Sequence, residues 1–378
     1  MKRLLYLSVL LIFVIQGFAQ EDLKYQKPPK EILELADFER APGLSMDSKM
    51  QKMLFMYRST YKTLQDLSEE EMKLAGLRIN PKTNISSTVT YIDNIKYKTI
   101  NEPDAKQVSG LPQNPRLSNF SWSPDEAKVA FTNTTAKGVE LWVFDFTSGA
   151  ARKLTNDNLN ANLGMPFTWY RSSDALLALV LPKDKPALIS SAEVIPEGPT
   201  VSVSEKGAKA QNRTYQDLLQ NATDEANFET LVTSELYKVD LNGSASLWKG
   251  KDIYSGFSFS PDGKYLMVIT MHRPYSYIVP LYRFPTTTNI YDINGKLISN
   301  FHEKPLIEIM PKGFMATTTG KRGISWRADK PATLHWVEAL DNGDPEVKVD
   351  YRDEVFELDA LLTVHLKVLL KQLTVTAD

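Results

Sequence analysis

The sequence predicts an all-β chain, a β-propeller whose blades each have four antiparallel strands. Two observations lead to this expectation. A turn of the Ser-Pro-Asp-Gly type recurs between apolar runs, and several copies are followed by a second hairpin with Asn-Gly or Ser-Gly at its tip. The six Trp, sixteen Tyr and sixteen Phe fit this view, because aromatic residues favour strands.

The recurrent turn has a simple physical basis. Proline sets φ, aspartate bonds its own backbone and glycine accepts positive φ, so the chain reverses tightly between two half-buried strands. The clearest copies are Phe120 to Asp125, leading into Val129, and Phe257 to Gly263, leading into Tyr265. Degenerate copies begin at Leu44, Phe167 and Ile324.

The second hairpins complete the repeating unit. Their strands run from Leu141, Leu236 and Asn289 to turns at Ser148-Gly149, Asn242-Gly243 and Asn294-Gly295. Two hairpins in tandem make one propeller blade. The unequal spacing of the turns implies inserted loops, since a blade takes roughly 40–50 residues. A β-sandwich remains the alternative, because turn-bounded strands alone do not separate the two folds.

The pattern divides the chain into segments. Residues 1–19 predict a secretory signal peptide, with Lys2 and Arg3 before an apolar run too short to span a bilayer; an uncleaved anchor is the alternative. Residues 20–40 predict a linker and a short helix, and residues 41–360 the blades, with an insertion near 183–228 and a helix near 214–220. We therefore expect a periplasmic or secreted protein without a later membrane span.

Composition excludes several kinds of site. The 44 basic and 46 acidic residues give a net charge of -2 and no electrostatic reason to expect nucleic acid as a partner. The absence of cysteine excludes disulfides, thiolate metal sites and a cysteine nucleophile. With four histidines, a multi-histidine metal site is not expected, and no cofactor motif occurs.

Catalytic motifs are also absent from the sequence as written. No Gly-x-Ser-x-Gly nucleophile elbow occurs, and no separated pair of acids suggests a carbohydrate-active propeller. The most suggestive run is 271–285, which places His272, Arg273, Tyr275 and Tyr277 in a proline-stiffened loop. Arginine suits carboxylate or carbonyl oxygens and tyrosine gives amphipathic contact, so we expect these four residues to face substrate. An ordinary inter-blade loop is the alternative.

Several long strings resemble one protein family. They are 25–32, 73–81, 212–218, 272–285 and 326–345, and with the intervening text the resemblance covers nearly all of 24–360. The chain resembles the N-terminal propeller of a prolyl-oligopeptidase-type serine peptidase, in the branch similar to the glutamyl endopeptidases of bacteria and chloroplasts.

The resemblance implies a serine endopeptidase whose propeller gates and contacts a peptide substrate, and the signal-like residues 1–19 predict that it is secreted. In that family an α/β-hydrolase domain with a Ser-Asp-His triad follows the propeller, so this chain is expected to lack that domain and to be inactive alone. Five blade-like cores are visible, fewer than in the family, which predicts an incomplete propeller. The alternative is a non-enzymatic, TolB-like propeller that acts as a binding or scaffold module.

The last residues depart from the family pattern. Residues 361–378 read as an aberrant tail, in which 361–366 and 372–378 match family text read one base out of frame. We hypothesise that these stretches are frameshift products, from a sequencing error or from gene decay, and the genomic reading frame around codons 360–378 decides this. A Gly-x-Ser-x-Gly frame downstream would favour the peptidase over the TolB-like alternative. Confirmed DNA with no hydrolase frame downstream would contradict the sequencing-error explanation.

Overall fold

The computed structural model describes residues 26–190, 214–359 and 367–373, and separates the chain into two compact units. The smaller unit comprises residues up to Ala41 together with Ser59–Tyr61. It holds the predicted short helix, α2 (Lys30–Ala36), and the Tyr61 hydroxyl donates to the Ala36 carbonyl at 3.0 Å. None of the α2 residues is buried, although the sequence suggested one apolar side.

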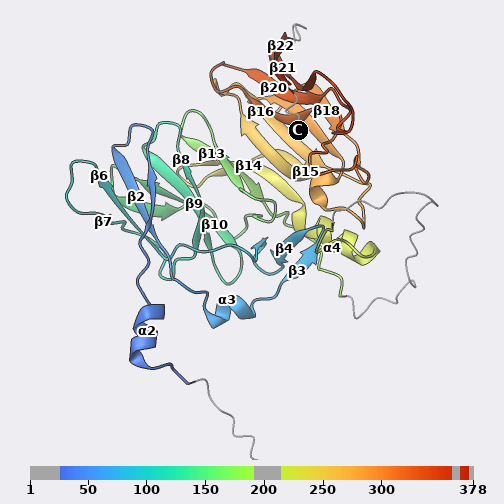
Figure 1. Cartoon of the computed structure of the whole chain (residues 1–378). Helices are drawn as coiled ribbons and strands as arrows, with labels where there is room; N and C mark the ends of the chain where they lie inside the picture. Colours follow the sequence, from blue (N-terminus) through green and yellow to red (C-terminus); the bar gives the residue numbers. More distant parts are fainter. Residues whose placement is uncertain (1–25, 191–213, 360–366, 374–378) are drawn as a thin grey trace, which may run out of the picture. The chain divides into compact units, whose positions relative to one another are not determined.

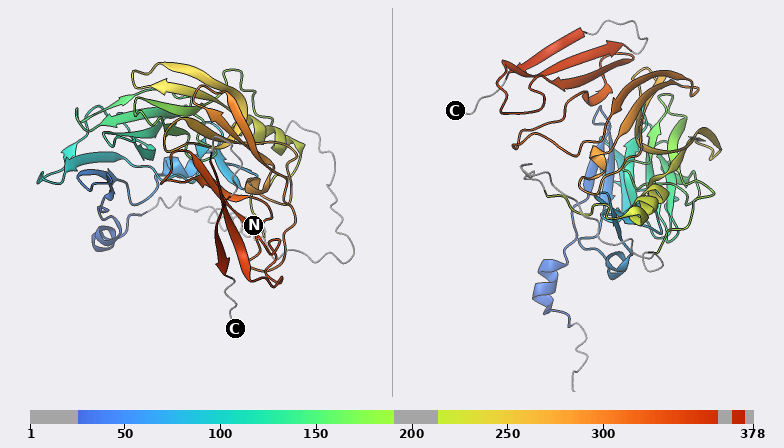
Figure 2. Two further views of the ribbon diagram at one scale, coloured as in Figure 1. Left: turned by 90° about the horizontal axis from the view of Figure 1, so that it is seen from above. Right: turned by 90° about the vertical axis from the view of Figure 1, so that its right-hand side faces the viewer.

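The larger unit consists of five four-stranded antiparallel meanders, which are the blades of a propeller (Figure 1). Blades 1, 2 and 5 are separate sheets, whereas blades 3 and 4 share the long strand β15 and form a seven-stranded sheet that curls strongly (Figure 2). The all-β propeller prediction is therefore confirmed, and all five predicted turns join the first two strands of a blade. The strands are β1 (Gly43–Met46), β2 (Lys52–Tyr57), β6 (Asn94–Thr99) and β7 (Lys106–Gln107) in blade 1; β8 (Leu117–Trp122), β9 (Lys128–Thr134), β10 (Val139–Asp145) and β11 (Ala150–Lys153) in blade 2; β12 (Phe167–Trp169), β13 (Ala175–Val180), β14 (Ser234–Asp240) and β15 (Ala245–Phe259) in blade 3; β16 (Tyr265–Met271), β17 (Thr286–Asp292) and β18 (Leu297–Lys304) in blade 4; and β19 (Arg322–Trp326), β20 (Thr333–Ala339), β21 (Tyr351–Asp359) and β22 (Lys367–Leu373) in blade 5.

The turn chemistry forms as the sequence indicates. The Ser123 hydroxyl donates to Asp125 and accepts from the Lys128 amide at 3.0 Å, while Asp125 also accepts from the Ala127 amide. Ser260 and Asp262 repeat the arrangement in blade 4. The side chains thus satisfy turn amides that no strand partner reaches.

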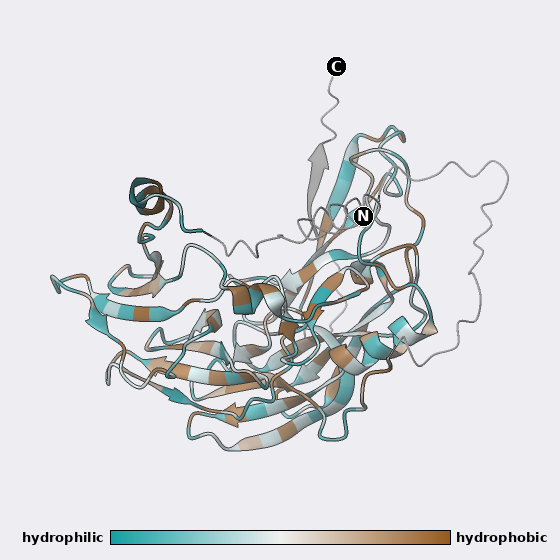
Figure 3. Ribbon diagram, turned by 90° about the horizontal axis from the view of Figure 1, so that it is seen from below, coloured by the Kyte–Doolittle hydropathy of each residue, from teal (hydrophilic) through white to brown (hydrophobic). Residues whose placement is uncertain are grey.

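Apolar clusters fill the spaces between consecutive blades. Strand β13, with the sequence ALLALV, is buried along its whole length, because blades cover both of its faces. In strands such as β14, with the sequence SELYKVD, apolar and polar residues alternate, and Figure 3 shows such alternation of colour along the strands. The cluster between blades 4 and 5 contains few fully buried members, namely Met267, Ile290 and Leu334.

Indole hydrogen bonds join consecutive blades. A tryptophan at the end of the first strand of one blade donates its Nε1–H to the first strand of the preceding blade. Blade 4 has Phe259 at this position, which packs on Tyr170 with ring centroids 4.6 Å apart. The three indole bonds are Trp122 to Ser45 Oγ (2.8 Å), Trp169 to the Ser121 carbonyl (3.1 Å) and Trp326 to the Ser258 carbonyl (3.0 Å).

The turns after the first strands form a second set of hydrogen bonds between consecutive blades. At each of the four blade interfaces, a turn residue of one blade donates to the turn of the next. The bonds are Ser48 N to Glu126 Oε1 (2.8 Å), Asp125 N to Ser173 Oγ (3.0 Å), Arg171 Nε to the Pro261 carbonyl (3.0 Å) and Asp262 N to the Pro331 carbonyl (2.9 Å).

The large insertions leave the blades at equivalent places. In blades 1, 3 and 4 they connect the second strand to the third, and in an antiparallel meander these connections emerge at one rim. They carry the small sheet β3 (Met72–Leu74), β4 (Leu77–Asn80) and β5 (Ile85–Ser86), the helices α3 (Leu64–Ser68) and α4 (Ala222–Val232), and the 3₁₀ turn η2 (Leu281–Arg283).

One element prediction is wrong. The helix expected near 214–220 begins instead at Ala222, because the Asn221 side chain accepts from the Asp224 amide at 2.9 Å and provides the cap. The predicted signal peptide, half of the 183–228 insertion (residues 191–213), and most of the aberrant tail lie outside the described residues. The described residues contain no helix long and apolar enough to cross a membrane.

We expect Trp169→Phe to lower the free energy of unfolding by about 2–3 kcal/mol, because it removes a hydrogen bond to the part-buried Ser121 carbonyl and opens a small cavity. Urea denaturation followed by circular dichroism measures this. Trp248→Phe is the matched control, since that indole also donates to a carbonyl, of Ile293, but at an exposed site. Equal losses in both variants would contradict the expectation that the buried indole between blades stabilises the fold more than an exposed one.

Candidate functional site

The inserted segments of blades 1, 3 and 4 pack into one cluster at the rim. Its apolar interior joins Leu74 and Ile79 of the small sheet to Phe228 and Leu231 of α4 and to Phe284. Figure 1 shows β3, β4 and α4 side by side. Three of the family-like strings therefore meet in space, namely 73–81, the described part of 212–218 (residues 214–218), and 272–285.

The turn between β3 and β4 holds the other two segments. Ala75 and Gly76 both have positive φ, 54° and 87°, as a tight two-residue hairpin turn requires. The Gly76 amide donates to the Asp217 carbonyl at 2.7 Å, and the Ala75 carbonyl accepts from the Leu281 amide at 2.9 Å. A Cβ on Gly76 would lie 2.9 Å from Pro280 Cβ, so the close approach requires glycine.

An ion pair fixes the segment 215–218 to the sheet. Arg78 Nε donates to Asp217 Oδ2 at 2.8 Å, across 139 positions of sequence. The bond raises the pKa of the Arg78 guanidinium, mainly through the hydrogen bond to the carboxylate. The charged contact complements the two backbone bonds of the neighbouring turn.

Helix α4 supplies the third side of the cluster. Its apolar face places the Phe228 ring edge-on to Tyr275, with centroids 5.3 Å apart, and perpendicular to Phe284 at 6.0 Å. Edge-to-face contacts of this kind add to the burial of the rings. The loop 272–285 is thereby held against the helix.

Two glutamates one turn apart on α4 bind the same loop. Arg273 forms ion pairs with Glu225 and Glu229, and its Nε donates to Glu229 Oε1 at 2.8 Å. The Tyr275 hydroxyl donates to the same oxygen at 2.9 Å. Burial, and then the hydrogen bond to Glu229, raise the pKa of Tyr275, so this phenol stays a neutral donor.

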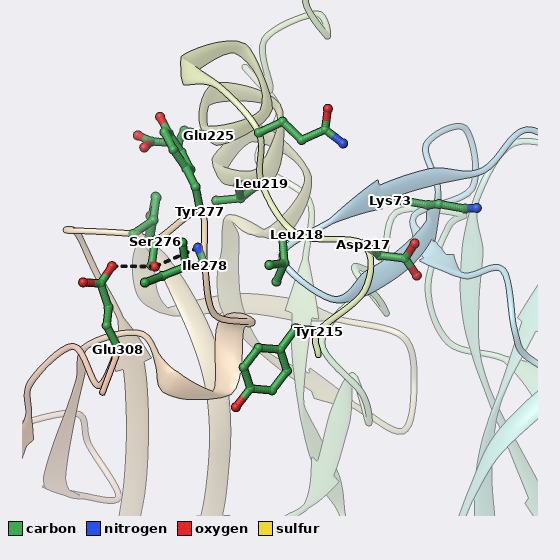
Figure 4. A pocket seen from close by; sticks show the side chains of 12 residues that line it. Lys73, Tyr215, Asp217, Leu218, Leu219, Glu225, Ser276, Tyr277, Ile278 and Glu308 are labelled. Carbon is green, nitrogen blue, oxygen red and sulfur yellow. Dashed lines mark hydrogen bonds between the residues drawn. The ribbon is translucent and has the colours of Figure 1, made fainter. Parts of the chain in front are cut away.

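A pocket of about 830 Å³ opens between these elements (Figure 4). Glu225, Tyr277 and Leu219 lie at one end of it and Tyr215 at the other, with Ser276 and Glu308 along one side. Tyr277 and Ile278 provide apolar surface with polar groups beside them. The remaining lining residues are Lys73, Asp217, Leu218, Gln220 and Tyr275.

The pocket chemistry supports binding rather than catalysis. Ser276 has the same hydroxyl group as the nucleophile of a serine peptidase. Its Oγ, however, donates to Glu308 at 2.6 Å and accepts from the Ile278 amide. No histidine is among the described lining residues, so the imidazole base of a serine triad is not present beside Ser276. The described residues also contain no cluster of three or more His, Asp or Glu able to hold a metal ion.

The four residues predicted to face substrate occupy different environments. Tyr275 and Tyr277 line the pocket, and burial together with Glu225 raises the pKa of Tyr277. Arg273 is held by the two glutamates instead of pointing at an open site. His272 lies outside the lining, with Nδ1 2.8 Å from the Arg273 carbonyl oxygen and Nε2 3.3 Å from Thr287 Oγ1.

Sequence reasoning missed the pocket residues outside the 271–285 run. Lys73 and Asp217 lie within family-like strings, but nothing in those strings marks them as site residues. Glu225 and Glu229 belong to an unremarkable acidic helix. Only the position of these segments in the blades could have indicated the pocket. All of them join the second and third strands of their blades and must emerge at the same rim.

Comparisons with known proteins extend the sequence resemblance. No family model matches the sequence. The chain is 35% identical over 351 residues to a probable chloroplastic glutamyl endopeptidase of Oryza sativa subsp. japonica, and 33% identical over 350 residues to a protein of the same name from Arabidopsis thaliana. Each alignment covers 88% of this chain. Over most of its length the chain is therefore homologous to proteins named glutamyl endopeptidase.

The chain spans about a third of the length of these relatives, 36% and 35% respectively. Among solved structures it is similar to an acylaminoacyl peptidase of Pyrococcus horikoshii, with 13% identity, a TM-score of 0.40, and 88% of this chain and 39% of that chain covered. It is also similar to a putative TolB of Agrobacterium tumefaciens, with 11% identity, a TM-score of 0.35, and 89% and 82% covered.

We expect Gly76→Ala to weaken the rim cluster and to lower the free energy of unfolding by about 1–3 kcal/mol, because the new methyl group meets Pro280. Urea denaturation measures the loss. Gly164→Ala is the matched control, since Gly164 also has positive φ but open space around it. A loss no larger than that of the control would show that backbone strain, and not the contact with Pro280, accounts for the effect.

Proposed function

We propose that this chain is the substrate-contacting propeller of a serine-type endopeptidase, and that the rim pocket binds part of a peptide substrate. The observation that carries the proposal is the convergence of three family-like strings on one pocket. Blades provide the rigid frame, and the inserted connections provide the contacts. Tyr277 and Ile278 offer amphipathic surface of the kind that suits an extended peptide.

The chemistry of bond cleavage is assigned to another part of the enzyme. The family resemblance implies an α/β-hydrolase domain with a Ser-Asp-His triad, and the relatives are far longer than this chain. Export of the protein to a periplasm or to the exterior belongs to the proposal and depends on the signal-like residues 1–19. On this view the propeller restricts entry and orients the peptide.

We expect this chain to bind a fluorescein-labelled, end-blocked ten-residue peptide without cleaving it. Tyr277→Ala should weaken binding five- to tenfold, about 1–1.4 kcal/mol, because the ring lines the pocket. Fluorescence anisotropy measures the dissociation constant. Tyr351→Ala, at an exposed position of β21, is the matched control and should leave it unchanged. Equal affinity in the chain and both variants would contradict binding at this pocket.

A further inference from the structure

The interface between blades 4 and 5 is held beside β18 by aromatic rings and a lysine. The Phe301 ring of β18 lies edge-on to Trp336 of β20, with centroids 5.2 Å apart. The Lys321 ammonium lies over both rings, 5.0 Å from the centre of Phe301 and 5.5 Å from that of Trp336. Because few residues are fully buried between these two blades, the interface depends on such contacts.

His302, the next residue of β18, lies at the same interface. Its Cε1 is 3.9 Å from the position that a Cβ on Gly320 would take, and the residue is half-buried. Its strand partner Thr288 is buried on β17, two positions from Ile290 of the inter-blade cluster. The charged groups around the imidazole come from both blades, namely Glu303, Lys304, Lys321 and Glu338.

These surroundings favour a neutral imidazole. Glu338 already accepts from the Trp336 indole at 2.7 Å, and Lys304 Nζ donates to the Tyr282 carbonyl at 2.9 Å. Burial, and after it the charge of Lys321, lower the pKa of the imidazole below its ordinary value of about 6.5. An opened interface would restore the ordinary pKa. The closed form is therefore fully stabilised above about pH 6.5 and loses stability as the pH falls.

The connection from blade 4 to blade 5 runs between these groups. It spans residues 305–320, after β18 and before Lys321, and carries Glu308. Glu308 lines the pocket and accepts from the Ser276 hydroxyl at 2.6 Å. The middle of the connection contributes little burial, since Phe314 is 96% exposed. Contacts at its two ends therefore have a large share in its position.

We propose that His302 is a pH-sensitive contact between blades 4 and 5, and that its protonation in mild acid loosens the connection 305–320 and opens the pocket on its Glu308 side. A charged imidazole would meet two lysines, Lys304 and Lys321, where the connection begins and ends. The effect on the pocket rests on the proposed function, whereas the change at the interface does not.

Amide hydrogen exchange at pH 7.5 and pH 5.5 tests the change at the interface. Rates in 305–320 are compared between the unmodified chain and His302→Gln at the same pH, so that the intrinsic exchange rate cancels. We expect the ratio of unmodified to variant rate to rise at least threefold from pH 7.5 to pH 5.5. His272→Gln, at an exposed position, is the matched control and should show the acid response of the unmodified chain.

A ratio that does not change with pH would overturn the inference, and so would loss of the acid response in His272→Gln. This comparison also allows for any constant loss of stability in His302→Gln, because such a loss affects both pH values.

Peptide binding tests the link to the pocket. The unmodified chain should bind the labelled, end-blocked peptide at least threefold more weakly at pH 5.5 than at pH 7.5 by fluorescence anisotropy, with a smaller change in His302→Gln. An equal change in both proteins would contradict the link. If the peptide binds at neither pH, the proposed function fails, while hydrogen exchange still decides whether His302 responds to acid.

Discussion

Face-to-face burial between consecutive blades is the constraint on which the rest of the structure depends. Each blade has two faces, and a strand such as β13 has apolar residues on both, so a blade alone would expose them to water. Apolar clusters therefore fill the spaces between blades. Indole bonds such as that of Trp169, and the turn-to-turn bonds, set the position of one blade on the next.

The meander also determines where function can reside. Tight turns occupy the connections between first and second strands, where they bond to one another across the blade interfaces. The connections between second and third strands emerge at the opposite rim and carry the insertions. The β3–β4 turn, the segment around Asp217 and the loop 272–285 come from three blades, yet the blades bring them together. A pocket made in this way depends on the frame, although no blade strand lines it.

The sequence was informative where local chemistry determines structure. Ser, Pro, Asp and Gly specify the blade turns by themselves, so all five blades could be predicted. The start of α4 was missed because a single side chain, Asn221, sets it. Of the residues that line the pocket, the sequence singled out Tyr275 and Tyr277, because they share a run with proline and arginine. Glu229 could not be predicted, because its role depends on Arg273, 44 positions away.

Amide hydrogen exchange of the chain with and without saturating peptide tests the central claim most directly. If three inserted connections form one peptide-binding surface on a rigid frame, exchange should slow together in 72–80, 214–220 and 272–285, while the blade strands change little. Protection confined to one of these segments, or found mainly in the blade turns on the other rim, would contradict the account.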